Sequence, residues 1–328
     1  MRKNTLGQTG IETSHLGFGC VQLTAHGDRS EAIRILEHAF ALGITHFDVS
    51  RIYGFGRAEG ILGEFLRGKR HQVTVATKFG IQPPSGLAGN RRVIDLAKKL
   101  LGPFPNLLRR ARQRGSKMVQ SGVFTPQSAV QSLESSLREL GTDLIDVFLL
   151  HEATLVDAAS EALIEALQRQ VDRGTIRSFG IASGFHNLQK DATRVPPVYQ
   201  VLQFEDNAAA QNIQTLLHRE GRALITHSIF QPFLPLCEAV TTLPAVTQEY
   251  ASQLSLNLAD PTVLASLLLQ SALRSNSTGV VLFSSTNQER VACNVRDAES
   301  PQYDDQQLSG FLEFTKNILQ AAPLRATP

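Results

Sequence analysis

The sequence predicts an α/β protein built as a closed (β/α)8 TIM barrel. Short apolar or β-branched runs alternate with longer stretches that have the period of amphipathic helices. The short runs are apolar at successive positions, which is typical of strands buried on both faces in a parallel sheet. Eight such runs within 328 residues fit a closed barrel better than an open sheet.

Eight segments have the composition and length expected of barrel strands. They are residues 14–19, 45–49, 72–78, 144–151, 175–182, 197–204, 222–227 and 279–284. Helical periodicity fills most of the intervals between them. The expected helices are residues 30–43, 57–68, 126–141, 159–174, 209–221, 260–274 and 287–295. For the helix at 260–274 we expect Asp260 as N-cap and Pro261 at the first helical position.

Two segments depart from the alternation of strands and helices. The first residues, RKNTLGQTGIETSH, contain two short extended pieces around GQTG and predict a β-hairpin that caps the barrel floor. A long insertion, residues 80–125, follows the third strand, where only a few residues are usual. We expect this insertion to be an active-site loop or lid on a single barrel domain that spans residues 1–328.

Composition and charge exclude several other classes of protein. The formal net charge of +2 gives no reason to expect nucleic-acid binding. Cys20, Cys237 and Cys293 are too few and too widely spaced for a disulfide framework or a zinc site, so we expect reduced thiols and no metal. The N-terminus has no apolar stretch of signal-peptide length, and VLASLLLQSAL is too short to span a bilayer. These features predict a cytoplasmic protein without membrane contact, and nothing indicates an oligomeric state.

The segment HFDVSRIYGFGRAEGILGEFL, residues 46–66, contains two competing candidates for function. Its glycines suggest a phosphate-binding loop, but they are spaced G-x-G-x-x-x-G, and five residues separate Asp48 from Gly54. A dinucleotide-binding loop needs glycines directly after the strand and an acid about twenty residues later. The next strand ends in Thr77 and Lys78, so the glycine interpretation is weak.

Polar residues at successive strand ends are the stronger candidates. Asp48 ends the second strand, Tyr53 follows it, Lys78 ends the third strand and His151 ends the fourth. Each alone is better explained as a helix cap, a solvated charge or a packed aromatic residue. Catalytic groups of such barrels lie at the C-terminal ends of the strands, so the four together favour an active site.

These four residue types suit proton transfer to or from a carbonyl oxygen. A tyrosine ordinarily titrates near pH 10, and a nearby ammonium lowers its pKa by favouring the phenolate. Asp48 can hold the Lys78 ammonium in place, and His151 can direct a substrate carbonyl at Tyr53.

The chain resembles the aldo-keto reductase superfamily over essentially its whole length. The segments that carry the resemblance are TLGQTGIETSHLGFG, GITHFDVSRIYGFGRAEGILGEFL, VATKFG and LRELGTDLIDVFLLH. The resemblance implies reversible hydride transfer between a nicotinamide cofactor and an aldehyde or ketone. It assigns Tyr53 as general acid, Lys78 as the group that depresses its pKa, Asp48 as the partner of Lys78, and His151 as the group that orients the carbonyl.

The resemblance also implies a set of cofactor-binding positions. They are Gly19, Cys20, Val21, Asp48, Ser183, Gly184, Gln203, His227, Phe230, Ser284, Ser285, Thr286, Arg290 and Asn294. Three depart from the family pattern: Gly184 replaces an asparagine, His227 replaces a stacking tyrosine, and Ser284 stands where glycine or lysine is usual. Gln203 matches the carboxamide-binding glutamine better than Gln200. The match of Arg290 to the clamp on the 2′-phosphate favours NADPH, while the absence of a lysine at Ser284 keeps NADH as an alternative.

The insertion carries a strong positive charge. Residues 91–117 contain nine basic side chains and one acid, Asp95, giving +8 in this segment and about −6 in the remainder of the chain. The basic residues are Arg91, Arg92, Lys98, Lys99, Arg109, Arg110, Arg112, Arg114 and Lys117. A solvated lid explains this charge. The sharper alternative is an anionic substrate or an acidic partner steered by the segment. Contact with a membrane surface, suggested by apolar residues at helical spacing in the same segment, is a less favoured alternative.

Two other functions remain open from the sequence. The three departures at the cofactor positions suit a cofactor-binding regulatory or structural subunit with little turnover, although such a subunit has no need of all four polar residues. A Schiff-base lyase with Lys78 as nucleophile is the third alternative. The N-terminal hairpin and the QERVACN segment argue against it.

Overall fold

The computed structural model describes residues 1–328 apart from 26–27, 83–121, 189–190, 220 and 322–328. Within the described residues, eight parallel strands form a closed barrel, as predicted. The barrel strands are β3 (Leu16–Gly19), β4 (His46–Asp48), β5 (Thr74–Phe79), β6 (Ile145–His151), β7 (Ile176–Ala182), β8 (Val201–Glu205), β9 (Ala223–His227) and β10 (Val280–Phe283). They pair in this order, and β10 pairs with β3 to close the barrel.

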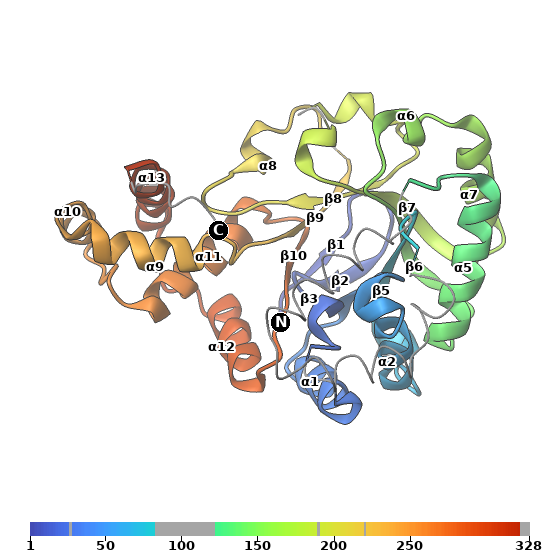
Figure 1. Ribbon diagram of the computed structural model, residues 1–328, viewed down its shortest axis with the longest axis horizontal. Helices are drawn as coiled ribbons and strands as arrows, with labels where there is room; N and C mark the ends of the chain where they lie inside the picture. Colours follow the sequence, from blue (N-terminus) through green and yellow to red (C-terminus); the bar gives the residue numbers. More distant parts are fainter. Residues whose placement is uncertain (26–27, 83–121, 189–190, 220, 322–328) are drawn as a thin grey trace, which may run out of the picture.

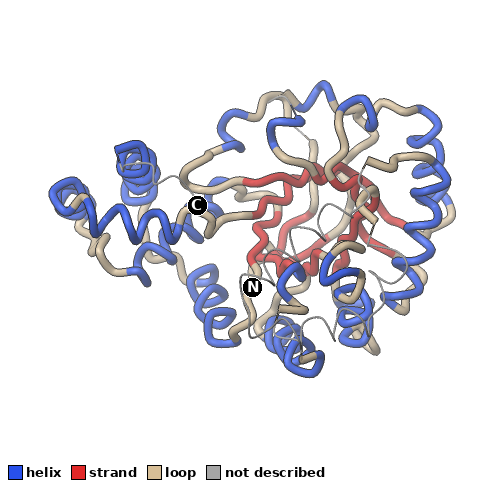
Figure 2. The backbone as a smooth tube through the Cα atoms, in the orientation of Figure 1, coloured by secondary structure: helices blue, strands red, loops and turns tan. Residues whose placement is uncertain are grey.

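Helices surround this barrel on its outside (Figure 1; Figure 2). They are α1 (Arg29–Ala41), α2 (Ala58–Phe65), α5 (Pro126–Leu140), α6 (Leu155–Ala158), α7 (Glu161–Asp172), α8 (Asn212–Thr215), α11 (Pro261–Ser275) and α12 (Gln288–Glu299). Asp260 caps α11 by accepting a hydrogen bond from the Thr262 amide, and Pro261 is its first residue, as expected.

The N-terminal hairpin closes one end of the barrel. Strands β1 (Lys3–Thr5) and β2 (Glu12–Ser14) pair antiparallel, and Leu6 and Ile11 between them are fully buried. Both side chains pack with residues from inside the barrel, including Val201 at the start of β8. The hairpin therefore covers the N-terminal ends of the strands and leaves the opposite end for the site.

The hairpin approaches the barrel closely at Gly7. This glycine has a left-handed φ of 50°, and a Cβ there would lie 2.6 Å from the backbone nitrogen of Ala223. A larger residue at position 7 would be strained and would push the hairpin off the barrel floor.

The helix predicted at 209–221 is largely wrong, because among the described residues of this segment only α8 is helical. The Asn207 side chain accepts hydrogen bonds at 3.0 Å from the backbone amides of both Ala209 and Ala210. Gln211 then takes a left-handed φ of 48°. The asparagine side chain thus stabilises a turn where the sequence pattern predicts a helix.

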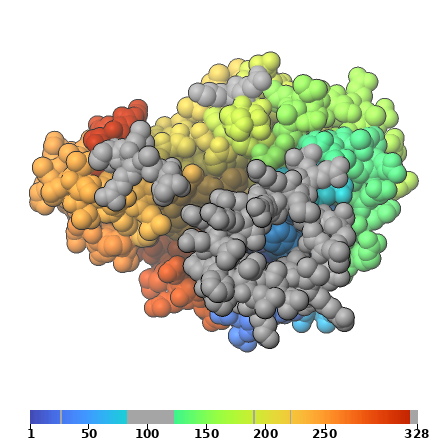
Figure 3. All heavy atoms as spheres, viewed as in Figure 1, coloured from blue at the N-terminus to red at the C-terminus, as the bar shows by residue number. Residues whose placement is uncertain are grey.

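Three helices outside the predicted set build a lobe beside the barrel. They are α9 (Phe233–Thr242), α10 (Pro244–Leu254) and α13 (Asp305–Ala321). Leu236, Leu254, Phe311 and Phe314 pack together in their shared core. In the space-filling view the orange and red atoms of this lobe project to one side (Figure 3).

Candidate active site

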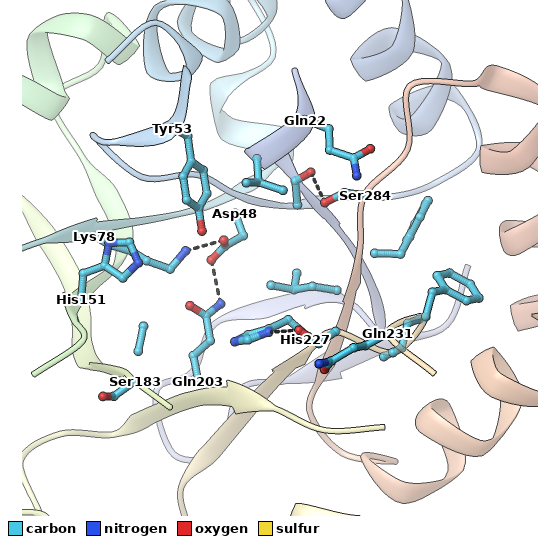
Figure 4. Close-up of a pocket in the computed structure, with 18 of the residues that line it drawn as sticks. Gln22, Asp48, Tyr53, Lys78, His151, Ser183, Gln203, His227, Gln231 and Ser284 are labelled. Atoms are coloured by element: carbon cyan, nitrogen blue, oxygen red, sulfur yellow. Dashed lines mark hydrogen bonds and ion pairs between the residues drawn. The ribbon is translucent and has the colours of Figure 1, made fainter. Parts of the chain in front are cut away.

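A cavity of about 470 Å³ lies at the C-terminal ends of the barrel strands. It contains all four of the polar residues that the sequence singles out, and Figure 4 shows how they face one another. The lining residues are Gly19, Val21, Gln22, Asp48, Tyr53, Lys78, His151, Glu152, Ala182, Ser183, Gln203, His227, Ser228, Ile229, Phe230, Gln231, Leu282, Phe283 and Ser284.

Asp48 and Lys78 form a buried ion pair at the base of the cavity. Lys78 Nζ donates to Asp48 Oδ1 and, at 3.2 Å, to the Val49 carbonyl. The other carboxylate oxygen of Asp48 accepts from Gln203 Nε2 at 2.8 Å. Strands β4, β5 and β8 therefore fix a three-residue hydrogen-bonded group in which both carboxylate oxygens have a donor.

The ion pair keeps Lys78 charged. Burial is the largest effect and lowers the pKa of Lys78, but the charges and hydrogen bonds of Asp48 and Tyr53 together outweigh it, and the net pKa lies above its ordinary value. An ammonium held in this way is a poor nucleophile. The geometry therefore disfavours the Schiff-base alternative.

Tyr53 lies above the ion pair in a short 3-10 helix, Tyr53–Phe55 (Figure 4). Lys78 Nζ is 5.3 Å from the centre of its ring. Burial raises the pKa of Tyr53, and the Lys78 charge lowers it by a smaller amount. The depressing effect of Lys78 is thus present as expected, but the net pKa of Tyr53 in this cavity is raised.

His151 lies beside Tyr53 in the cavity lining. The two rings are 6.2 Å apart at an interplanar angle of 86°. Burial, together with the Lys78 charge, lowers the pKa of His151 to about 3, so the imidazole is neutral at physiological pH. Ser50 Oγ lies 3.1 Å from His151 Nδ1.

The predicted cofactor positions fall into two groups. Gly19, Val21, Asp48, Ser183, Gln203, His227, Phe230 and Ser284 line the cavity. Cys20, Gly184, Ser285, Thr286, Arg290 and Asn294 lie outside this lining. Cys20 is fully buried in the core around the strands. Arg290 is exposed in the first turn of α12, whose N-cap Asn287 accepts from the Arg290 amide.

The three departures from the family pattern, and Ser183 beside them, make contacts within the protein itself. Ser284 Oγ donates to the Gly19 carbonyl at 2.7 Å and so joins β10 to β3. Ser183 Oγ donates to the Ala153 carbonyl and accepts from Asn187 Nδ2 at 2.8 Å. A Cβ at Gly184 would approach the His186 ring to 2.7 Å, so the glycine accommodates that ring. His227 Nδ1 contacts Ser228 Oγ at 2.8 Å.

Several cavity residues are absent from the predicted set. Glu152 follows His151 with a left-handed φ of 58°, and its Oε2 accepts from the Gly184 amide at 3.3 Å. Gln22 and Gln231 add two amide side chains to the lining. In the sequence, Glu152 directly follows the strand-end residue His151, and this position is the signal from which its place in the cavity lining could have been predicted.

The remaining expectations from the sequence concern the basic insertion, membrane spans and metal sites. The basic residues of 91–117 lie outside the described residues, as does nearly all of the predicted insertion at 80–125. Across the described ranges, no helix is long and apolar enough to cross a membrane. Within those same ranges, no group of three or more His, Cys, Asp or Glu side chains is arranged to hold a metal ion.

A closed parallel barrel with Asp, Tyr, Lys and His around its C-terminal mouth is the arrangement that the resemblance to the aldo-keto reductases implies. A sequence model described as the aldo/keto reductase family matches residues 15–314. The chain therefore belongs to the aldo/keto reductase family, whose members are NAD(P)H-dependent oxidoreductases.

Individual relatives agree with this membership. An uncharacterized oxidoreductase of Bacillus subtilis is 28% identical over 204 residues, covering 62% of this chain and 55% of that protein. Pyridoxal 4-dehydrogenase of Microbacterium luteolum is 27% identical over 252 residues, covering 70% of each chain. The match thus spans only about half of the Bacillus subtilis relative.

Solved structures show the same fold over more of the chain. An aldo-keto reductase of Bacillus halodurans in its holo form aligns with a TM-score of 0.69 at 20% identity, covering 96% of each chain. A thermostable aldo-keto reductase in complex with the inhibitor epalrestat aligns with a TM-score of 0.66 at 18% identity, covering 96% of this chain and 100% of that one.

Proposed function

We propose that the protein reduces an aldehyde or ketone with NADPH, or catalyses the reverse oxidation of the alcohol, with Tyr53 as the general acid. The observation that carries this proposal is the convergence of Tyr53 and His151 above the Asp48–Lys78 ion pair inside one cavity. A carbonyl oxygen bound between the two rings would meet two proton donors and a buried positive charge. This combination suits stabilisation of an oxygen that gains negative charge.

Tyr53 supplies the proton to that oxygen. Its raised pKa keeps the phenol protonated at neutral pH, so the proton is available when the carbonyl binds. The Lys78 ammonium, 5.3 Å from the ring centre, then stabilises the phenolate that remains. Asp48 holds the ammonium in position and is itself held by Gln203.

His151 orients the carbonyl. Because the imidazole is neutral, it can donate one hydrogen bond without adding a second charge beside Lys78. The imidazole and phenol rings are 6.2 Å apart between their centres, so a carbonyl oxygen bound beside both could accept a hydrogen bond from each.

The cavity suits a nicotinamide ring and its carboxamide. Ser183 and Gln203 are the residues that would bind the carboxamide, with the Gln203 carbonyl oxygen free of the bond to Asp48. His227 would stack on the ring. When bound, a reduced nicotinamide supplies the hydride that the carbonyl carbon receives.

The N-terminus of α12 suits the phosphates of the same cofactor. The residues that would bind there, at the positive end of the α12 dipole, are Ser285, Thr286, Arg290 and Asn294. The exposed Arg290 guanidinium matches a 2′-phosphate and supports a preference for NADPH. NADH is the alternative, because Ser284 offers no second cation.

One observation favours a second candidate, a cofactor-binding subunit with little turnover. The Ser183 hydroxyl hydrogen is already committed to the Ala153 carbonyl, and Gly184 has no side chain to replace it. Fewer carboxamide contacts would hold the nicotinamide less well. The presence of all four polar residues in one cavity speaks against this candidate, because a subunit without turnover has no need of them together.

Isothermal titration calorimetry with NADPH and, separately, NADH tests the cofactor, and loss of nicotinamide absorbance with added carbonyls tests the reaction. Small cytoplasmic aldehydes and ketones, anionic ones first because of the basic insertion, form the screen, with pyridoxal added because of the name of the Microbacterium luteolum relative. Tight NADPH binding with turnover supports the proposal. Binding without turnover of any carbonyl supports the second candidate, and absence of binding removes both.

A further inference from the structure

Ser50 connects the two residues that face the carbonyl in the proposed reaction. It lies between β4 and the 3-10 helix of Tyr53 and is fully buried. Its backbone carbonyl accepts from the Tyr53 amide at 3.0 Å, which begins the turn that carries Tyr53. Its side-chain oxygen lies 3.1 Å from Nδ1 of His151, which comes from β6 more than a hundred positions later.

The direction of the Ser50–His151 hydrogen bond follows from what else the serine can reach. A buried hydroxyl hydrogen that lacks an acceptor costs free energy, so such groups are nearly always paired. Among the described residues, His151 Nδ1 is the only partner of Ser50 Oγ. If Nδ1 carried the proton, the serine hydrogen would have no acceptor there. The serine therefore donates, and Nδ1 accepts.

This direction determines where His151 carries its own hydrogen. A neutral imidazole has one N–H, and when one nitrogen accepts a hydrogen bond the other is the donor. His151 is neutral because burial and the nearby Lys78 charge lower its pKa to about 3, with His227 adding to the effect and Asp48 opposing it. Nε2 is thus the protonated nitrogen, and it is the one left available to a ligand in the cavity that His151 lines.

We propose that Ser50 is a positioning residue that fixes His151 as the Nε2–H tautomer, so that this nitrogen donates to the substrate carbonyl oxygen. Its backbone carbonyl sets the turn of Tyr53 at the same time, so one residue fixes both groups that bind that oxygen. The catalytic consequence rests on the proposed carbonyl reduction, whereas the tautomer itself is a property of the protein alone.

Long-range ¹H–¹⁵N NMR on protein labelled at histidine tests the tautomer without cofactor or substrate. The His151 signals are identified by their loss in His151→Asn. In the wild type we expect a neutral ring protonated at Nε2. In Ser50→Ala, which removes only the hydroxyl, we expect a mixture of the two tautomers. Ser50→Cys keeps the side-chain size and a weak donor, and should give an intermediate mixture.

Ser228→Ala is the matched control, because Ser228 makes the same kind of contact with Nδ1 of a different histidine, His227, at 2.8 Å. It should alter the His227 signals and leave those of His151 unchanged. A wild-type ring protonated at Nδ1, or an unchanged His151 tautomer in Ser50→Ala, would overturn the proposal. Because the first of these outcomes needs only the wild type, the proposal is tested even if Ser50→Ala fails to fold.

Kinetics separate positioning from simple structural support. We expect Ser50→Ala to lower kcat for carbonyl reduction by about tenfold while cofactor affinity is unchanged, with Ser50→Cys recovering part of the loss. Equal losses in cofactor affinity and kcat would indicate general damage and refute positioning. If the tautomer shifts as expected but the wild type reduces no carbonyl, the tautomer assignment holds and the proposed function fails.

Discussion

The phenol ring of Tyr53 stands nearly perpendicular to the imidazole of His151, at 86° with 6.2 Å between the ring centres. Each ring is positioned from a different strand, and beneath them lies a single ammonium, Lys78, held by Asp48. An oxygen bound beside both rings would meet both side chains.

Tyr53→Phe removes the proposed proton donor and keeps the ring. We expect carbonyl reduction to fall by about 100-fold or more, because a positioned general acid typically contributes that much. Cofactor affinity should be unchanged, since the hydroxyl points toward the ion pair (Figure 4). Steady-state kinetics and calorimetry on the same preparation measure the two effects. Full activity in this variant would rule out the assigned role.

Lys78→Met removes one half of the buried ion pair. Lys78 and Asp48 have side chains only 3% and 4% exposed, so the lone carboxylate would be left in a poorly solvated site. We expect the free energy of unfolding to fall by about 3 to 5 kcal/mol, as for other broken buried pairs. Urea denaturation followed by circular dichroism measures the loss.

The double variant Asp48→Asn/Lys78→Met is the control for that loss. It removes both charges while the side-chain amide at position 48 retains a group that can bond to Gln203. We expect it to be more stable than Lys78→Met and equally inactive, because the uncompensated charge is gone but proton supply is not restored. If the double variant is no more stable than Lys78→Met, the loss of stability in Lys78→Met comes from lost packing and not from the uncompensated charge.

Arg290→Ala tests the preference for NADPH. A charge-assisted hydrogen bond to a phosphate contributes about 1.5 to 3 kcal/mol, so the NADPH dissociation constant should rise roughly 10- to 100-fold. NADH has no 2′-phosphate, and its affinity should change little. Calorimetry with both cofactors on wild type and variant gives the comparison. Parallel losses for the two cofactors would remove Arg290 from the phosphate site.

The sequence carried enough information for the barrel and for the gathering of Asp48, Lys78 and His151 in one cavity. Strands buried on both faces leave a clear apolar pattern, and a polar residue at the end of such a run marks the barrel mouth, as Asp48, Lys78 and His151 do. The extra helices were harder to predict, although Phe311, Phe314 and Ile318 of α13 have helical spacing and pack inward. Their partners come from α9, α10 and α11, which local periodicity does not reveal.

The sequence pattern does not predict contacts between residues that lie far apart in the chain. Nothing near Ser50 in the sequence indicates a bond to His151, and the turn that Asn207 stabilises looks like a helix from apolar spacing alone. The raised pKa of Tyr53 is a similar case. Its sign depends on how deeply the cavity buries the phenol, and the neighbouring charges alone suggest the opposite direction.

Acid sensitivity should come partly from His46, which is fully buried within the barrel. Burial lowers its pKa to about 4, although Asp48 and Asp146 act in the opposite direction. The unfolded chain therefore takes up a proton near pH 6.5 that the folded protein binds only near pH 4. The free energy of unfolding should fall as the pH drops through this window, by about 2 to 3 kcal/mol from this residue.

His46→Leu isolates this effect, because neither ring nitrogen of His46 has a hydrogen-bond partner among the described residues. The variant loses no bond there and should be at least as stable as the wild type at pH 7. Burial raises the pKa of Asp206 to about 6, so the folded state binds this proton more tightly than the unfolded state. The contribution of Asp206 to the free energy of unfolding therefore rises as the pH falls, opposite to that of His46. The Asp206 contribution is the same in the wild type and the variant. Urea unfolding at pH 7 and at pH 4.5 should therefore show a smaller decrease in the free energy of unfolding for the variant than for the wild type. Equal decreases for the two proteins would mean that the pKa of His46 does not differ between the folded and unfolded states.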